Sequence, residues 1–168
     1  LKVNFINTST VMARRSVLQA MNGFDQRLRY GEDLELWLRI AARHGVACVP
    51  GVQEIRVEHS SNVTKSTEPM LTGYVAMAEV IRNWAAPMMP AWGLRPDRYV
   101  ADCVTDLGYW YFTQGRLREA RRAFGRSLKE SPNLRAGLYG ALSALPSGLV
   151  AGLRKMKSAL RSAPDRQT

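Results

Sequence analysis

A proline-rich break constrains the fold of this chain more than any other feature of its sequence. Pro87, Pro90, Gly93 and Pro96 interrupt the helical pattern within ten residues. Proline lacks a backbone N–H and its ring clashes with the preceding turn, so no single helix or strand runs through this segment. We therefore place the main boundary of the chain here and expect two regions of different construction.

Charge also separates the two regions. The formal net charge of the 168 residues is +10, but residues 1–115 carry 12 Lys and Arg against 11 Asp and Glu, whereas residues 116–168 carry 12 against 3. A basic tail of this kind suits anionic lipid, nucleic acid, an acidic partner or a solvated helix face. Charge alone does not choose among them.

The region before the break shows the patterns of both strands and helices. Polar and apolar residues alternate from Phe5 to Arg14, which is typical of a strand, and residues 46–49 and 52–57 suit short extended segments. Apolar residues at helical spacing after Gly31 predict a helix, and another is expected to begin near Pro69. The expected fold class is therefore α/β.

After the break, the pattern is helical from Asp97 onward. Turns are expected at Gln114-Gly115, at Ser131-Pro132 and at residues 146–148, where glycine, proline and serine gather. We therefore expect four domains or segments: residues 1–66, a helix and connector at 67–96, a helical hairpin at 97–145, and a basic amphipathic tail at 146–168.

An ordered set of motifs in residues 5–64 carries the most specific signal. The set comprises a polar strand and its arginines at 8–15, Gly23-Phe24-Asp25, Glu32-Asp33, and Glu35-Leu-Trp-Leu-Arg39. It resembles the acceptor-side, carboxy-terminal part of family 2 glycosyltransferases, which have the GT-A fold. The resemblance implies an α/β chain with a helical appendage, from an enzyme that moves a sugar from a nucleotide-sugar donor to a hydroxyl acceptor with inversion.

The resemblance implies that Asp33 is the general base. A sugar hydroxyl is a poor nucleophile, and a positioned carboxylate takes its proton as the new bond forms. Glu32 either orients the acceptor or caps the helix. Asp25 suits a structural role in its turn, where a carboxylate bonds nearby backbone N–H groups.

The same resemblance implies substrate contacts for Thr8, Ser9, Trp37 and Arg39. Trp37 also lies on the apolar side of its predicted helix, so core packing and a platform for a sugar ring are both open. His59 follows the last predicted strand, where it suits either a metal ligand near the donor's diphosphate or a surface histidine.

No Asp-x-Asp motif for the donor's metal occurs in the sequence. The complete enzyme is expected to use Mg²⁺ or Mn²⁺, with most ligands in a nucleotide-binding half outside these residues, so this fragment alone is expected to be inactive.

The tail resembles one tetratricopeptide helix pair, with residues at that repeat's offsets: Leu107-Gly108, Tyr111, Gly115, Ala120, Phe124 and Pro132. The alternative to the enzyme is therefore a non-catalytic helical-repeat adaptor. The basic tail leaves peripheral contact with the inner face of a membrane open, which suits a lipid-linked acceptor. Nucleic acid is not expected as a partner, because basic and aromatic residues do not alternate.

Two cysteines far apart in sequence, Cys48 and Cys103, suit free thiols in a reducing compartment. No stretch approaches the roughly 20 apolar residues that a membrane helix needs. We therefore expect a cytoplasmic location.

Overall fold

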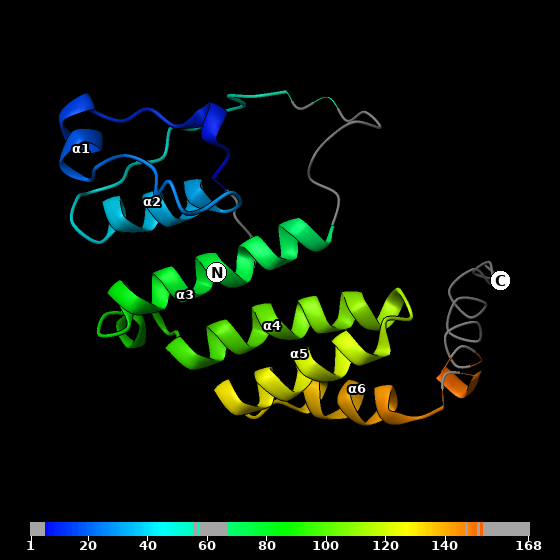
Figure 1. Ribbon diagram of the computed structural model, residues 1–168. Coiled ribbons are helices and arrows are strands. Elements are labelled where there is room, and N and C mark those ends of the chain that lie inside the picture. Colours follow the sequence, from blue (N-terminus) through cyan, green and yellow to red (C-terminus); the bar gives the residue numbers. More distant parts are fainter. Residues whose placement is uncertain (1–5, 56, 58–66, 147, 151, 153–168) are drawn as a thin grey trace, which may run out of the picture. The chain divides into compact units, whose positions relative to one another are not determined.

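A computed structural model describes residues 6–55, 57, 67–146, 148–150 and 152 of the chain (Figure 1). The chain divides into two compact units, Leu1–Asn83 (unit 1) and Trp84–Thr168 (unit 2). The division falls just before the proline-rich break, where the sequence places its main boundary.

In unit 1, the described residues form short helices and one long helix, joined by loops. A 3-10 turn, η1, spans Thr8–Thr10, and the helices α1 and α2 span Arg15–Ala20 and Glu32–Ala41. The helix α3 spans Glu68–Ala85 and passes into unit 2 at its end. Arg14, the residue before α1, makes no side-chain bond that caps this helix.

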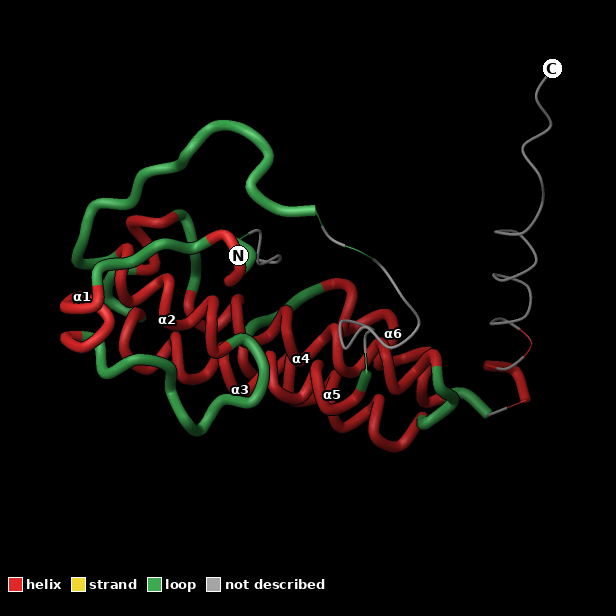
Figure 2. Tube along the Cα trace, turned by 90° about the horizontal axis from the view of Figure 1, so that it is seen from above, coloured by secondary structure: helices red, strands yellow, loops and turns green. Residues whose placement is uncertain are grey.

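The predicted α/β fold is wrong, because the described residues form no strand (Figure 2). The segment at 45–57, as far as it is described, is extended loop, and Val46, Val52 and Ile55 are 66%, 85% and 86% exposed. A strand needs a neighbouring chain to complete its hydrogen bonds, and none of the described residues supplies one. An alternation of polar and apolar residues shows only that a segment could lie in a sheet, not that a partner strand is present.

The same finding corrects the family resemblance. A GT-A fold requires a central β-sheet, and the described part of this chain is built from helices and loops. The predicted resemblance to family 2 glycosyltransferases is therefore wrong. The predicted α/β class with a helical appendage is wrong for the same reason.

Unit 2 is a helical array in which the predicted turns at Gln114-Gly115 and Ser131-Pro132 are confirmed. A 3-10 turn, η2 (Met89–Trp92), precedes α4 (Pro96–Thr113), α5 (Leu117–Glu130) and α6 (Leu134–Ala144). Proline at the first position of α4 suits a helix start, because its missing N–H has no partner there anyway. Gly115 has φ of 77° in the turn between α4 and α5.

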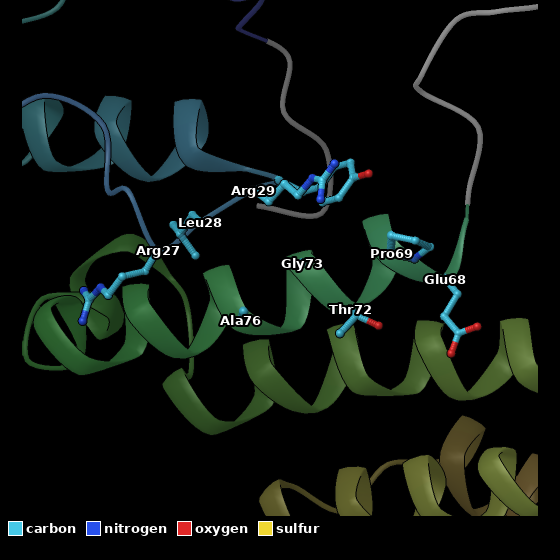
Figure 3. A pocket seen from close by; sticks show the side chains of 9 residues that line it. Arg27, Leu28, Arg29, Glu68, Pro69, Thr72, Gly73 and Ala76 are labelled. Atoms are coloured by element: carbon cyan, nitrogen blue, oxygen red, sulfur yellow. The ribbon is translucent and has the colours of Figure 1, made fainter.

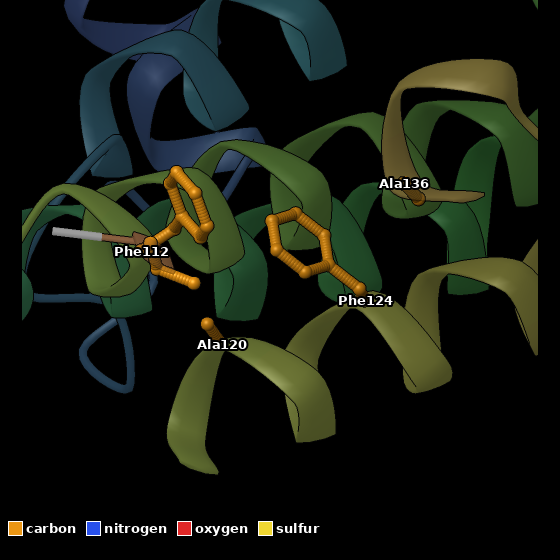
Figure 4. Close-up of a cluster of buried hydrophobic side chains, with 5 residues drawn as sticks. Phe112, Ala120, Phe124 and Ala136 are labelled. Atoms are coloured by element: carbon orange, nitrogen blue, oxygen red, sulfur yellow. The ribbon is translucent and has the colours of Figure 1, made fainter. Parts of the chain in front are cut away.

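The core of unit 2 is apolar and closely packed. Phe124 of α5 is fully buried among Phe112, Ala120, Ala136 and Val150 (Figure 4). A Cβ atom added at Gly108 would lie 2.9 Å from the ring of Phe124, so the glycine lets α4 and α5 approach closely. Small and large residues thus alternate where these helices meet.

A buried polar network joins α4, α5 and the start of α6. The hydroxyls of Thr105 and Ser127 lie 2.7 Å apart, and the Asn133 side chain donates to Ser127 at 2.9 Å. Asn133 also accepts from the Ala136 backbone N–H at 2.7 Å, which caps α6. Since each of these side chains has partners, the network fixes the register of the helices without leaving a buried polar group unbonded.

Candidate functional site

The start of α2 places two carboxylates at one corner of unit 1. Gly31 precedes the helix with φ of 76°, a left-handed conformation that glycine adopts without strain. Glu32, Asp33 and Glu35 occupy the first turn, where the helix dipole favours negative charge. The N-cap residue, Gly31, has no side chain that could cap this helix.

Two residues that the sequence assigned to the site meet here. The Thr8 hydroxyl of η1 donates to Asp33 Oδ2 at 3.1 Å, across 25 residues of chain. Asp33 Oδ1 accepts from the Leu34 backbone N–H at 2.7 Å. These bonds orient the carboxylate, whose residue is only partly buried. Ser9 lies next to Thr8 on the same turn and is exposed.

The negative charges at the start of α2 also act on Tyr74 of α3. Burial raises the pKa of its hydroxyl, and the negative charges of Asp33 and Glu32 raise it further. No role was assigned to Tyr74 from the sequence, because only tertiary structure brings α3 beside the start of α2.

Two glycines set the approach of the chain to α3. A Cβ added at Gly73 would lie 2.7 Å from the Cβ of Tyr30, and one added at Gly31 would meet the sulfur of Met77. The turn that precedes α2 therefore packs directly on the backbone of α3. This contact holds the Glu32-Asp33 corner in place.

A pocket of about 360 Å³ lies between residues 27–30 and the first half of α3 (Figure 3). Leu28, Pro69 and Ala76 give it apolar walls, and Arg29 and Thr72 add polar groups. Its volume falls within the range of roughly 300–1,000 Å³ that is usual for small-molecule sites.

Next to the pocket, Arg27 and Asp25 form an ion pair. Arg27 Nη2 lies 2.6 Å from Asp25 Oδ2, and Arg27 Nε donates to Oδ1 at 2.9 Å. Hydrogen bonds from the side chain and the backbone of Arg27 lower the pKa of Asp25 to about 2. Asp25 bonds within its own turn, as the sequence predicted.

Arg39 is engaged in the interior of unit 1. Its guanidinium donates to both Glu35 oxygens at 2.7 Å, to the Gly23 carbonyl at 2.8 Å, and to the Met21 carbonyl. Glu35 is 1% exposed, so this pair ties the turn after α1 to α2. The predicted substrate contact of Arg39 stays a prediction.

Trp37 packs edge-on against Phe24, with ring centroids 6.1 Å apart. Its indole N–H is buried, and no described residue accepts a hydrogen bond from it. The geometry accounts for packing by Trp37, and its role as a sugar platform stays a prediction.

The predicted metal ligand is not among the described residues. His59, the predicted ligand, lies outside them, and the described chain holds no cluster of three His, Cys, Asp or Glu side chains.

Among the residues that the structure covers, no helix combines the length and the apolarity needed to cross a membrane. The chain has no match among protein-family models, curated proteins or solved structures.

Proposed function

We propose that unit 1 supplies the acceptor side of an enzyme that transfers a sugar from a nucleotide-sugar donor to a hydroxyl group, with inversion. The contact between Thr8 and Asp33 carries the proposal, since it joins a residue expected to bind substrate to the residue expected to act as general base. The proposal concerns chemistry at this corner and assumes no particular fold.

In this reaction Asp33 is the general base. The acceptor oxygen attacks the anomeric carbon, the bond from that carbon to the nucleotide diphosphate breaks, and the acceptor proton passes to a carboxylate oxygen of Asp33. Thr8 and the Leu34 N–H hold the carboxylate in one orientation. Because a general base works through its placement, these two bonds contribute directly to the rate. In this proposal Glu32 orients the acceptor.

Mg²⁺ or Mn²⁺ and most of its ligands belong to the donor side in this proposal, outside the described residues. A cytoplasmic enzyme, peripheral at the inner face of the membrane when its acceptor is lipid-linked, suits the two cysteines, since neither Cys48 nor Cys103 forms a disulfide.

The test measures turnover of a nucleotide-sugar panel with Mg²⁺ or Mn²⁺, using the longest chain that the gene encodes around these residues. Asp33→Asn is expected to lower kcat at least 100-fold or so while donor binding persists. Thr8→Val should lower kcat by about tenfold, since it leaves the base present but less constrained. Asp25→Asn is the matched control, because Asp25 is bonded to Arg27.

Unchanged turnover in Asp33→Asn would remove Asp33 from the role of base. Absence of turnover with every donor would favour the second candidate.

That second candidate is a non-catalytic binding module built on α4, α5 and α6. It is favoured by the outer side of α6, where Leu134 and Leu138 are 89% and 54% exposed. Exposed leucines on one helix face suit contact with another protein. Selection from a displayed peptide library tests this candidate: binders that lose affinity for Leu134→Ser/Leu138→Ser but not for the control Arg118→Ser would support it, and a selection without binders would contradict it.

A further inference from the structure

We propose that the pocket between residues 27–30 and α3 is an acceptor subsite for a sugar that carries an acidic group, either a carboxylate or a phosphate. This inference rests on the proposed sugar transfer and names the class of its acceptor. It is drawn from the shape of the pocket, from its charges and from its place in the chain.

The shape suits one sugar ring against an apolar wall. Leu28 is 8% exposed and lines the pocket together with Pro69 and Ala76 of the facing helix (Figure 3). Tyr30 adds an aromatic ring, and its close packing on Gly73 fixes its position. The C–H face of a sugar ring packs on apolar and aromatic side chains of this kind.

The charges of the pocket select an anion. Two guanidinium groups line it, but Arg27 is bonded on two nitrogens to Asp25. Arg29 is exposed, and within the described part of the chain it has no hydrogen-bond or ion-pair partner. A guanidinium binds a carboxylate or a phosphate through two parallel hydrogen bonds, so Arg29 is suited to hold the acidic group.

The opposite wall offers groups for sugar hydroxyls. Thr72 of α3 presents an exposed hydroxyl, which both donates and accepts, and Glu68 lies one turn earlier on the same helix. A second anionic group on the ligand would meet the Glu68 carboxylate and be disfavoured. The pocket thus suits a singly acidic sugar.

The pocket also lies close to the proposed base along the chain. Tyr30 lines the pocket, and Asp33 follows it by three residues across the Gly31 turn. The packing of this turn on Gly73 and Met77 fixes both the pocket wall and the start of α2. One rigid segment therefore carries the acceptor wall and the base.

The experiment measures binding without turnover, by ligand-observed NMR and calorimetry on the full 168-residue chain. The probes are D-glucuronate, glucose 6-phosphate, methyl glucoside and inorganic phosphate. We expect at least one acidic sugar to bind more tightly than both methyl glucoside and inorganic phosphate. Arg29→Gln should weaken that binding by about tenfold, the usual scale for one charged hydrogen-bonding partner.

Two variants control for position and for folding. Arg27→Gln removes the other arginine of the pocket and is expected to change affinity less than Arg29→Gln does, since Arg27 is engaged with Asp25. Ala76→Leu fills the pocket from α3 and should abolish binding. Circular dichroism checks that each variant retains the helical content of the parent chain.

Equal affinity for inorganic phosphate and for the sugars would overturn the sugar assignment, and binding that survives both Arg29→Gln and Ala76→Leu would overturn the site. These failures differ from failure of the proposed function. If Asp33→Asn abolishes turnover but no acidic sugar binds, only the subsite is wrong. If an acidic sugar binds in the pocket but Asp33→Asn turns over normally, the assignment of the base is wrong.

Discussion

The α4–α5 core of unit 2 and the extended loop of unit 1 treat their apolar residues in opposite ways. In unit 2, Phe124 and Val104 are almost completely buried between helices, whereas in unit 1 Val52 and Ile55 are more than four-fifths exposed on an extended loop. A helix completes its backbone hydrogen bonds within one segment and needs a partner only for its apolar face. A strand needs a partner for its backbone as well. Apolar segments of similar hydrophobicity therefore form helices in unit 2 and an extended loop in unit 1.

The comparison extends to how each unit is held together. Unit 2 relies on a continuous apolar core, and its polar network sets the register of the helices against one another. The candidate site of unit 1 relies on single contacts: Thr8 with Asp33, Arg39 with Glu35, and the Gly31 turn on Met77. Single substitutions should therefore affect the two units differently.

The largest effect is expected from Phe124→Ala. Removal of a fully buried phenylalanine from a packed core costs about 3–5 kcal/mol, so hydrogen exchange in α4, α5 and α6 should lose most of its protection. Ile55→Ala in unit 1 is the contrast and should change stability by less than about 0.5 kcal/mol, since the side chain is 86% exposed. A large effect of Ile55→Ala would show that its loop is packed in solution.

The next effect is expected within unit 1, from Arg39→Ala. This change leaves the Glu35 carboxylate buried without its cation, which costs about 3 kcal/mol. Amide exchange in α2 should report it, while α5 should be unaffected. Arg43→Ala, near the end of the same helix and exposed, serves as the control. Equal effects of the two substitutions would contradict a clamp at Arg39.

A smaller effect is expected from Asn133→Ala in unit 2. The variant loses the cap of α6 and the bond to Ser127, together about 2 kcal/mol. Urea denaturation measures this loss of stability. Asn83→Ala, at an exposed position on α3, is the control. If the two variants unfold at the same urea concentration, the network contributes nothing to the stability of the array.

The smallest effect concerns pH. The pKa of Asp25 is about 2 in the folded chain against an ordinary value of 3.8, so its ion pair with Arg27 stabilises unit 1 above pH 3.8 or so. That contribution is lost as the pH falls from 3.8 towards 2. Asp25→Asn should flatten this part of the stability profile, measured as the urea midpoint at pH 4 and pH 2.5. An unchanged profile would show that other carboxyl groups account for the loss.

The helices of unit 2 were largely readable from the sequence. The turns at Gln114-Gly115 and Ser131-Pro132 are where glycine and proline predict them, because these residues act on the local backbone. The start of α2 after Gly31 was readable for the same reason.

The candidate site was readable only in part. The sequence singled out Asp33 and Thr8 but gave no sign that their side chains would bond across 25 residues. The influence of the carboxylates on Tyr74 and the pocket that Arg29 lines depend on how α3 packs against the turn at residues 28–31. Such contacts between distant segments leave no periodic pattern in the sequence.

The sequence by itself determined where helices begin and end after the proline-rich break, because each helix closes its own hydrogen bonds. Only the tertiary structure decided that the segments at 6–14 and 45–57 form no sheet within the described chain, that Arg39 is held by Glu35, and that a pocket forms beside α3. These outcomes depend on partners far away in the chain, and the energy of such contacts is fixed by three-dimensional packing rather than by neighbours in sequence.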